Sequence, residues 1–450
     1  MRCPAWLSVL FFLGGTICGG AQAQENAPNT VLFENVRIFD GTSKSLSPAS
    51  NVLVRGNLIT RISREAIPVD RTRGLRIIQG GGRTLMPGLI DAHWHATMAV
   101  LPESVMMTAD DGYLALVAGR EARNTLLRGF TTVRDLSGPV FGLKRAIDTG
   151  VIEGPRIWPA GAMITQTGGH GDFRMPYEVP KALGAPLSHA EVGGSSAIAD
   201  TPDEVRLRAR EQLMKGAVFL KLAAGGGVAS NYDPLDASQY TEAEFRAAVE
   251  AAENMGTYVT VHAYTPRAIQ TAIRAGVRCI DHGQLMDEAT AKLIADKGIW
   301  LCLQPFLDDQ DAAPFPEGST NRAKQLQMHK GTDTAYALAK KHNLKLAWGT
   351  DVLFDAKLAA RQGAQLAKMT RWFTPAEVLV MATATNAELL TLSGPRNPYL
   401  GKLGVVQEGA LADLLLVDGD PIANLRLIED PAKNLLVIMK DGRIYKNGLP

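Results

Sequence analysis

Short apolar runs of β type occupy both ends of the chain. Residues 31–33 form such a run near the N-terminus and residues 414–417 form one near the C-terminus. Turn residues, including Asp-Gly pairs, separate these runs. Because neither end has enough strands to bury a hydrophobic face alone, we expect residues 24–87 and 398–450 to build one small β-sandwich domain together.

The middle of the chain, residues 88–397, has apolar strand-like runs that alternate with amphipathic stretches. Thr241 and Glu244 form a capping box that opens one helix, and Pro266 takes the first position of another. The strand candidates are residues 89–93, 131–135, 156–158, 218–222, 258–262, 279–282, 300–304 and 346–351. This α/β alternation predicts a closed (β/α)8 TIM barrel, with an open α/β sheet as the alternative.

The first residues have the features of an export signal. Arg2 precedes a short apolar run, and Ala21-Gln22-Ala23 has the small-x-small form of a signal-peptidase site. The run is too short for a permanent membrane anchor, and a buried N-terminal helix is the alternative. We expect residues 1–23 to be removed and the protein to be periplasmic or secreted. Beyond this segment the chain has only Cys279 and Cys302, which we expect to be buried free thiols.

Amino-acid composition and net charge exclude several classes of protein. The chain of 450 residues has 47 Lys and Arg against 46 Asp and Glu, and 46% of its residues are hydrophobic. This balance excludes a disordered, fibrous or many-pass membrane protein. A near-zero net charge also argues against nucleic acid as a partner, because such proteins need a basic surplus to displace phosphate counterions. We expect no membrane partner either.

Six chemically versatile side chains stand at the carboxyl ends of predicted strands. A barrel gathers these ends around one mouth, so the six would converge there although they are far apart in the sequence. For any one histidine, a hydrogen-bonded core position is the alternative. The six residues are His93, His95, Lys221, His262, His282 and Asp351.

Imidazole nitrogens and carboxylate oxygens suit a borderline cation such as Zn²⁺. Lys221 is the exception, because an ammonium group cannot coordinate a cation and is costly to bury at the end of an apolar strand. If its amine reacts with CO₂, the resulting carbamate is an anionic ligand able to bridge two metals. An ion pair between Lys221 and a nearby carboxylate is the alternative.

The motifs resemble those of the amidohydrolase superfamily. Residues 86–95 (Met-Pro-Gly-Leu-Ile-Asp-Ala-His-Trp-His) look like its first-strand motif, Gly-Thr-Asp at 349–351 resembles its eighth-strand motif, and residues 404–414 match the return into its β-domain. Phe-Leu-Lys at 219–221 and Ile-Asp-His-Gly at 280–283 narrow the resemblance to the imidazolonepropionase-related branch of Xaa-Pro dipeptidases, which includes ochratoxin-hydrolysing amidohydrolases.

This resemblance implies a ligand set and an assembly. It implies two divalent metal ions, with His93 and His95 on the more buried one and Asp351 also bound to it. His262 and His282 would hold the second metal, and carboxylated Lys221 would bridge the two. The family further suggests a homo-oligomer.

Such a site suits hydrolysis of an amide or peptide bond in a small molecule. Two metals activate a water and polarise a carbonyl, and Asp351 could take the proton of that water and pass it to the leaving amine. His170, in a glycine-rich loop, is a candidate donor to the developing oxyanion, with a purely structural loop role as the alternative. Tyr264, two residues after His262, is a candidate for binding a substrate carboxylate.

We therefore expect an enzyme that releases a C-terminal amino acid from an N-acyl amino acid or dipeptide, ochratoxin A being one such amide. A cyclic-amide hydrolase, a deaminase and a non-catalytic binding protein on the same scaffold are the alternatives. Two long insertions, residues 168–201 and 305–320, would overhang the site. Their apolar side chains favour a hydrophobic or aromatic acyl group. These are Phe173, Met175, Tyr177, Phe306 and Phe315.

Overall fold

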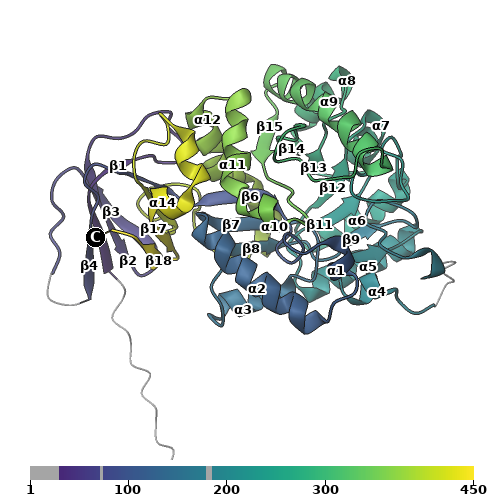
Figure 1. Cartoon of the computed structure of the whole chain (residues 1–450), viewed down its shortest axis with the longest axis horizontal. Coiled ribbons are helices and arrows are strands. Elements are labelled where there is room, and N and C mark those ends of the chain that lie inside the picture. The colour runs from purple at the N-terminus through teal and green to yellow at the C-terminus, as the bar shows by residue number, and fades with distance from the viewer. Residues whose placement is uncertain (1–29, 71–73, 179–184, 450) are drawn as a thin grey trace, which may run out of the picture.

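The computed structural model describes residues 30–70, 74–178 and 185–449. The expected export signal, residues 1–23, lies outside these ranges. A β-domain built from both chain ends lies beside a larger α/β body, as Figure 1 shows. Among the described residues, no helix has both the length and the apolar composition needed to cross a bilayer.

The β-domain is one mixed sheet that joins the two chain ends, as expected. Its strand order is β18-β17-β16-β5-β1-β2-β3, with β4 paired to β1. One end of β1 pairs with β2 and β4, and the other pairs with β5, so β1 connects the two halves of the sheet. The strands are β1 (Thr30–Ile38), β2 (Ser50–Arg55), β3 (Leu58–Ser63), β4 (Leu75–Gln79), β5 (Thr84–Pro87), β16 (Leu414–Val417), β17 (Leu435–Lys440) and β18 (Arg443–Asn447).

The second body is the predicted barrel of parallel strands. Every strand candidate of the sequence corresponds to a strand, and the third is interrupted: its first part, β8, pairs with β7, and its second part, β9, pairs with β11. The short β10 (Ser196–Ile198) is added beside β9. The barrel strands are β6 (Leu89–Trp94), β7 (Phe130–Asp135), β8 (Arg156–Pro159), β9 (Met163–Thr165), β11 (Leu220–Ala223), β12 (Val259–Ala263), β13 (Cys279–His282), β14 (Trp300–Leu303) and β15 (Lys345–Trp348).

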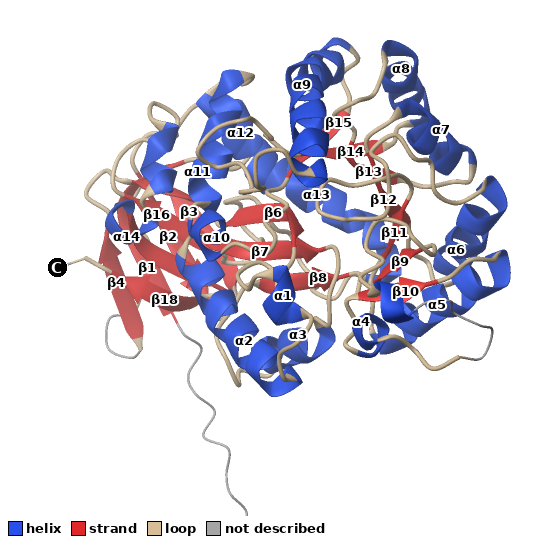
Figure 2. Cartoon of the chain, turned by 45° about the vertical axis from the view of Figure 1, so that its right-hand side comes forward, coloured by secondary structure: helices blue, strands red, loops and turns tan. Residues whose placement is uncertain are grey.

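Helices cover the outside of these strands (Figure 2). The capping box of Thr241 and Glu244 opens α6, and Pro266 starts α7, as the sequence predicts. The longer helices are α2 (Asp111–Leu127), α3 (Phe141–Asp148), α5 (Pro202–Lys215), α6 (Glu242–Asn254), α7 (Pro266–Arg274), α8 (Glu288–Lys297) and α9 (Thr320–Lys341). The shorter ones are α1 (Glu103–Met106), α4 (His189–Val192), α10 (Ala356–Ala360), α11 (Gln362–Ala367), α12 (Pro375–Val380), α13 (Asn386–Leu390) and α14 (Pro431–Asn434).

The first and last barrel strands are joined by a side chain. The amide nitrogen of Asn386 donates hydrogen bonds of 2.8 Å to the carbonyl oxygens of Ile90 in β6 and Trp348 in β15. Beyond the strands, the backbone N–H of Asp351 donates to the carbonyl oxygen of His93 at 2.8 Å. Asn386 directly follows a π-helical turn, Met381–Thr385. Such turns are frequent at functional sites.

Candidate metal centre and substrate cavity

A cavity of about 280 Å³ opens at the carboxyl ends of the barrel strands. The insertions after β9 and β14 contribute to its wall, as expected from their positions in the sequence. All six predicted metal ligands, together with His170 and Tyr264, line this cavity. The structure therefore brings together side chains that lie up to 258 positions apart, from His93 to Asp351.

His93, His95 and Asp351 form the tightest group in the cavity. One carboxylate oxygen of Asp351 lies 3.1 Å from Nε2 of His93 and 3.0 Å from Nε2 of His95. The three donor atoms lie within 4.8 Å of one another, close enough to bind one cation. Nδ1 of His95 is buried without a hydrogen-bond partner in the described structure.

Two of the predicted ligands have unusual backbone conformations. His282 has a φ of 82° and Asp351 has a φ of 54°, in the left-handed region that residues other than glycine rarely adopt. His282 closes β13 and Asp351 lies three residues after the end of β15, so the chain turns sharply where each side chain enters the cavity. Strain of this kind concentrates at functional sites, where the surrounding structure enforces it.

His262 and His282 lie together on the neighbouring wall. Their ring centroids are 4.4 Å apart, and those of His282 and His93 are 4.9 Å apart. Gln304 fixes the ring of His282, since Nδ1 of His282 lies 2.7 Å from its Oε1 and donates to it. This hydrogen bond leaves Nε2 of His282 as the free nitrogen, which is the usual arrangement in a metal-binding histidine.

Burial keeps these imidazoles in the neutral form. Desolvation lowers the pKa of His93, His262 and His282 below the usual value for histidine, although Asp351 acts in the opposite direction on His93 and His282. Metal ligation requires deprotonated nitrogen donors. The donor set therefore fits a divalent cation in its protonation state as well as in its geometry.

Lys221 lies in the same cavity but is paired with a carboxylate. Its Nζ donates to Oδ2 of Asp281 at 2.7 Å, which corresponds to the ion-pair alternative considered for this residue. Burial alone would raise the pKa of Asp281, but the charges of Lys221 and Arg134 outweigh it and hold that pKa far below the usual value. Asp281 is thus an anion at every physiological pH.

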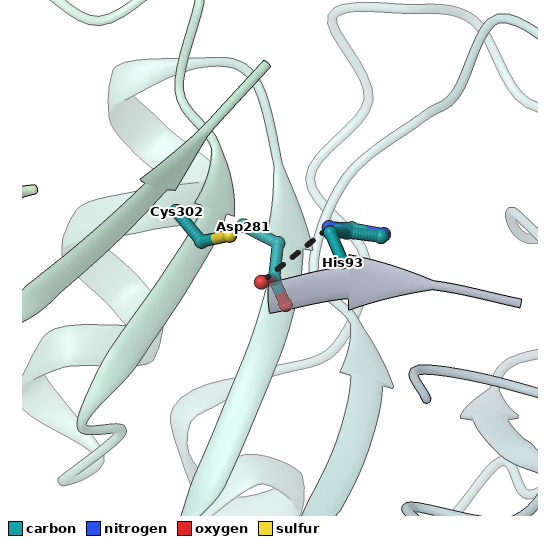
Figure 3. Close-up of side chains that lie close together, drawn as sticks. All are labelled: His93, Asp281 and Cys302. Atoms are coloured by element: carbon teal, nitrogen blue, oxygen red, sulfur yellow. Dashed lines mark ion pairs between the residues drawn. The ribbon is translucent and has the colours of Figure 1, made fainter. Parts of the chain in front are cut away.

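Asp281 also belongs to a second group of ligand-type side chains, shown in Figure 3 with His93 and Cys302. Nδ1 of His93 lies 3.6 Å from Oδ1 of Asp281, on the side of the ring away from Asp351. However, the guanidinium group of Arg134 already donates to the same Oδ1 at 3.0 Å. Burial also raises the pKa of the Cys302 thiol well above its usual value, so it does not supply a thiolate. The guanidinium of Arg134 therefore supplies the positive charge in this group.

Arg134 has no exposed surface and connects several barrel strands. It donates to the carbonyl oxygen of Ala92 at 3.0 Å and to the hydroxyl of Tyr258 at 3.1 Å, and its guanidinium lies 4.7 Å from the ring centroid of Phe219. These contacts fix the position of Asp281 and, through it, that of Lys221.

His170 and Tyr264 occupy the part of the cavity beside His262. The ring of His170 stacks on that of His262 at 4.0 Å, and its Nδ1 lies 2.7 Å from the hydroxyl oxygen of Ser230. The Tyr264 ring lies 4.9 Å from the His262 ring and 5.1 Å from the His282 ring. Both side chains can therefore reach a molecule bound next to these imidazoles.

Three of the five apolar side chains predicted to line the cavity do so. Phe173, Phe306 and Phe315 line the cavity. Met175 and Tyr177 do not: they are 40% and 84% exposed, because the segment around the 3₁₀ turn at Pro176–Glu178 runs over the surface. The expectation that these two residues contribute to the acyl pocket is wrong.

Sequence reasoning missed three residues of the site: Asp281, Arg134 and Gln304. The signal for two of them was present, because Arg134 and Asp281 are opposite charges within short apolar strands, where an unpaired charge is too costly. Gln304 ends the run 300–304, one strand after His282, but a glutamine at a strand end carries no signal of its own for a site. Cys279 and Cys302 are buried free thiols, as predicted.

Known proteins share both sequence and structure with this chain. Ochratoxinase from Aspergillus niger is 30% identical over 94% of this chain and 88% of its own length. A crystal structure of an amidohydrolase is 34% identical, with a TM-score of 0.84, over 94% of this chain and all of that one. A prolidase crystallised with N-methylphosphonate-L-proline is 31% identical, with a TM-score of 0.84, over 93% of this chain and all of that one.

A sequence profile of the amidohydrolase family matches residues 84–445. This range contains the whole barrel and the strands by which the chain returns into the β-domain. The chain therefore belongs to the amidohydrolase family, and it is a hydrolase that acts on amide bonds.

Proposed function

We propose that the chain is a two-metal amidohydrolase that releases a C-terminal amino acid from a dipeptide or an N-acyl amino acid. The observation that carries this proposal is that all six predicted ligands converge in a single cavity: His93, His95, Lys221, His262, His282 and Asp351. The related ochratoxinase and the prolidase crystallised with a proline derivative support an amide substrate that ends in an amino acid. Ochratoxin A, cleaved to phenylalanine and ochratoxin α, is one candidate.

In this proposal the donor atoms divide into two sets. His93, His95 and Asp351 hold one divalent cation, most simply Zn²⁺ because nitrogen and carboxylate donors suit it. His262 and His282 hold the second cation. Lys221, once carboxylated by CO₂, would be a ligand shared by both cations in place of its contact with Asp281. When bound, the metal pair supplies Lewis-acid chemistry that activates a water and polarises the substrate carbonyl.

The protein's own side chains direct the proton and the substrate. Asp351 accepts the proton of the attacking water and delivers it to the nitrogen of the leaving amine. His170 donates a hydrogen bond to the substrate carbonyl oxygen as negative charge develops on that oxygen. The hydrogen bond between Nδ1 of His170 and Ser230 orients the His170 ring for this role. The hydroxyl of Tyr264 donates a hydrogen bond to the α-carboxylate of the leaving amino acid.

The proposal extends to location and assembly. The signal-like segment at residues 1–23 supports export, to the periplasm or outside the cell, and the family supports a homo-oligomer. Mass measurement of the purified protein tests both, through the N-terminal cleavage point and through the particle mass.

The decisive experiment measures metal content and turnover together. The purified protein is loaded with Zn²⁺, its metal is quantified, and release of free amino acids is followed with dipeptides, N-acyl amino acids and ochratoxin A. About two metals per chain and release of the C-terminal residue are expected. Hydrolysis confined to cyclic amides, deamination without amino-acid release, or no bound metal would contradict the proposal.

A further inference from the structure

Glu103 differs from the other carboxylates that line the cavity. It begins α1, is half-buried, and lies in the cavity wall. Burial raises the pKa of its carboxyl group, and neither a hydrogen bond nor a neighbouring charge acts against that effect. A carboxylate in such a place is costly unless something pairs with it.

The remaining acidic residues of the cavity wall all have protein partners. Asp351 contacts His93 and His95, and Asp311 pairs with Arg361 and Lys368. Asp355 caps α10 by accepting from the backbone N–H groups of Lys357 and Leu358. Lys221 is the one lysine or arginine among the described lining residues, and it is paired with Asp281. No protein cation in this wall is available to Glu103.

The surroundings of Glu103 are apolar. Met98, Leu353 and Phe354 also line the cavity and belong to one hydrophobic cluster with Met106 of α1, the helix that Glu103 begins. A cationic group of a bound ligand would therefore meet a low-dielectric wall with one negative charge in it. Under these conditions a charge-assisted hydrogen bond discriminates strongly between charged and neutral ligands.

By the order of the barrel strands, Glu103 also lies across the cavity from Tyr264, which is proposed to bind the substrate carboxylate. The segment that leads from β6 to α1 pairs with the segment after β15, through hydrogen bonds from Phe354 N–H to the Met98 carbonyl and from Asp355 N–H to the Ala99 carbonyl. Glu103 therefore lies on the side of the cavity formed by the segments that follow the first and eighth strands of the barrel. Tyr264 follows β12, the fifth strand, which lies opposite the first in an eight-stranded barrel.

We propose that Glu103 binds an ammonium group on the acyl side of the substrate, so that the enzyme prefers dipeptides or other amino-acylated substrates over uncharged N-acyl amino acids. This inference rests on the proposed function and narrows its substrate class. One end of the cavity then holds the carboxylate of the leaving amino acid, and the other holds the cation of the acyl residue. The apolar wall that favours a hydrophobic acyl group remains, but that group carries a positive charge.

Three matched substrates test the inference. Leucyl-phenylalanine carries an α-ammonium, 6-aminohexanoyl-phenylalanine carries only a terminal ammonium, and 4-methylpentanoyl-phenylalanine carries neither. We expect the wild-type enzyme to prefer at least one charged substrate. The change Glu103→Gln should lower kcat/KM for that substrate by roughly 10- to 100-fold and leave the neutral one nearly unchanged. The substrate that loses most identifies which ammonium is bound.

The control variant is Glu317→Gln, which removes an equal charge from a carboxylate that pairs with Arg322 and is 81% exposed. It should leave all three rates unchanged. Equal losses on all three substrates with Glu103→Gln, or no loss on any, would overturn the inference.

A binding measurement separates this inference from the proposed function. Phosphinic analogues of leucyl-phenylalanine and 4-methylpentanoyl-phenylalanine are titrated calorimetrically into wild type and Glu103→Gln. A preference for the amino-bearing analogue that disappears with Glu103→Gln supports the ammonium site even if no substrate is turned over. Turnover without that preference overturns the ammonium site and leaves the amidohydrolase assignment standing.

Discussion

Two groups of metal-ligand side chains share His93 and differ in what surrounds them. On one side of the ring, Nε2 faces Asp351 and His95 at the open cavity. On the other side, Nδ1 faces Asp281 and Cys302 in the closed barrel interior. Both groups have three donors close enough for a cation, but the inner one already contains the guanidinium of Arg134.

The comparison shows that donor type and spacing do not by themselves identify a metal site. The inner carboxylate is compensated by Arg134, so a divalent cation there would have to displace fixed positive charge. The outer carboxylate of Asp351 contacts the imidazoles of His93 and His95, and burial favours the neutral form of His93. Uncompensated negative charge therefore favours the outer group over the inner one as a cation site.

The largest expected effect comes from the outer group. Asp351→Asn should lower kcat by 10²-fold or more, because proton transfer by a positioned carboxylate typically contributes about 10²- to 10⁴-fold. The folded barrel should persist, as judged by circular dichroism. Asp308→Asn, which removes an exposed carboxylate paired with Arg322, is the matched control. Activity within a few-fold of wild type in Asp351→Asn would remove this residue from the mechanism.

Lys221 tests the proposed link between the outer group and the second cation site at His262 and His282. Lys221→Ala should lose most of its bound metal, and short carboxylic acids such as acetate should restore part of it by replacing the carbamate. Lys221→Met fills the same space, so it should lose metal without being rescued. Metal analysis after gel filtration measures both, and full metal content in the methionine variant would contradict a bridging carbamate.

Arg134 tests the inner group. Arg134→Met removes the guanidinium that pairs with Asp281, and breaking such a buried pair costs about 3–5 kcal/mol of unfolding free energy. Urea unfolding measures this loss. Arg123→Met, which breaks an exposed pair with Glu153, should cost about 1 kcal/mol at most. An additional bound metal in Arg134→Met would show that the guanidinium alone kept metal from the inner group.

The smallest effect is expected at Cys302. Because its thiol stays protonated and donates toward the carbonyl oxygen of Ala92, Cys302→Ala should leave metal content unchanged. The lost sulfur should cost roughly 1 kcal/mol of unfolding free energy. A fall in metal content would make Cys302 a ligand and would end the distinction between the two groups.

The sequence predicted the barrel and the outer group because both follow from strand ends. His93, His262 and His282 each end or follow an apolar run, and barrel geometry brings such ends together without further information. Arg134 and Asp281 could not be paired in this way, because their contact crosses the barrel interior and depends on which strands face each other. Met175 and Tyr177 show the same limit for a long loop, whose path no periodicity fixes.

The hydrogen bonds of Asn386 have a consequence for how the site responds to motion. One amide group holds Ile90 and Trp348, which lie three residues before His93 and Asp351 respectively. If the barrel loosens at this seam, both chain segments are released by the same event. The two side chains that face each other in the cavity are therefore kept in register by a residue that never enters it.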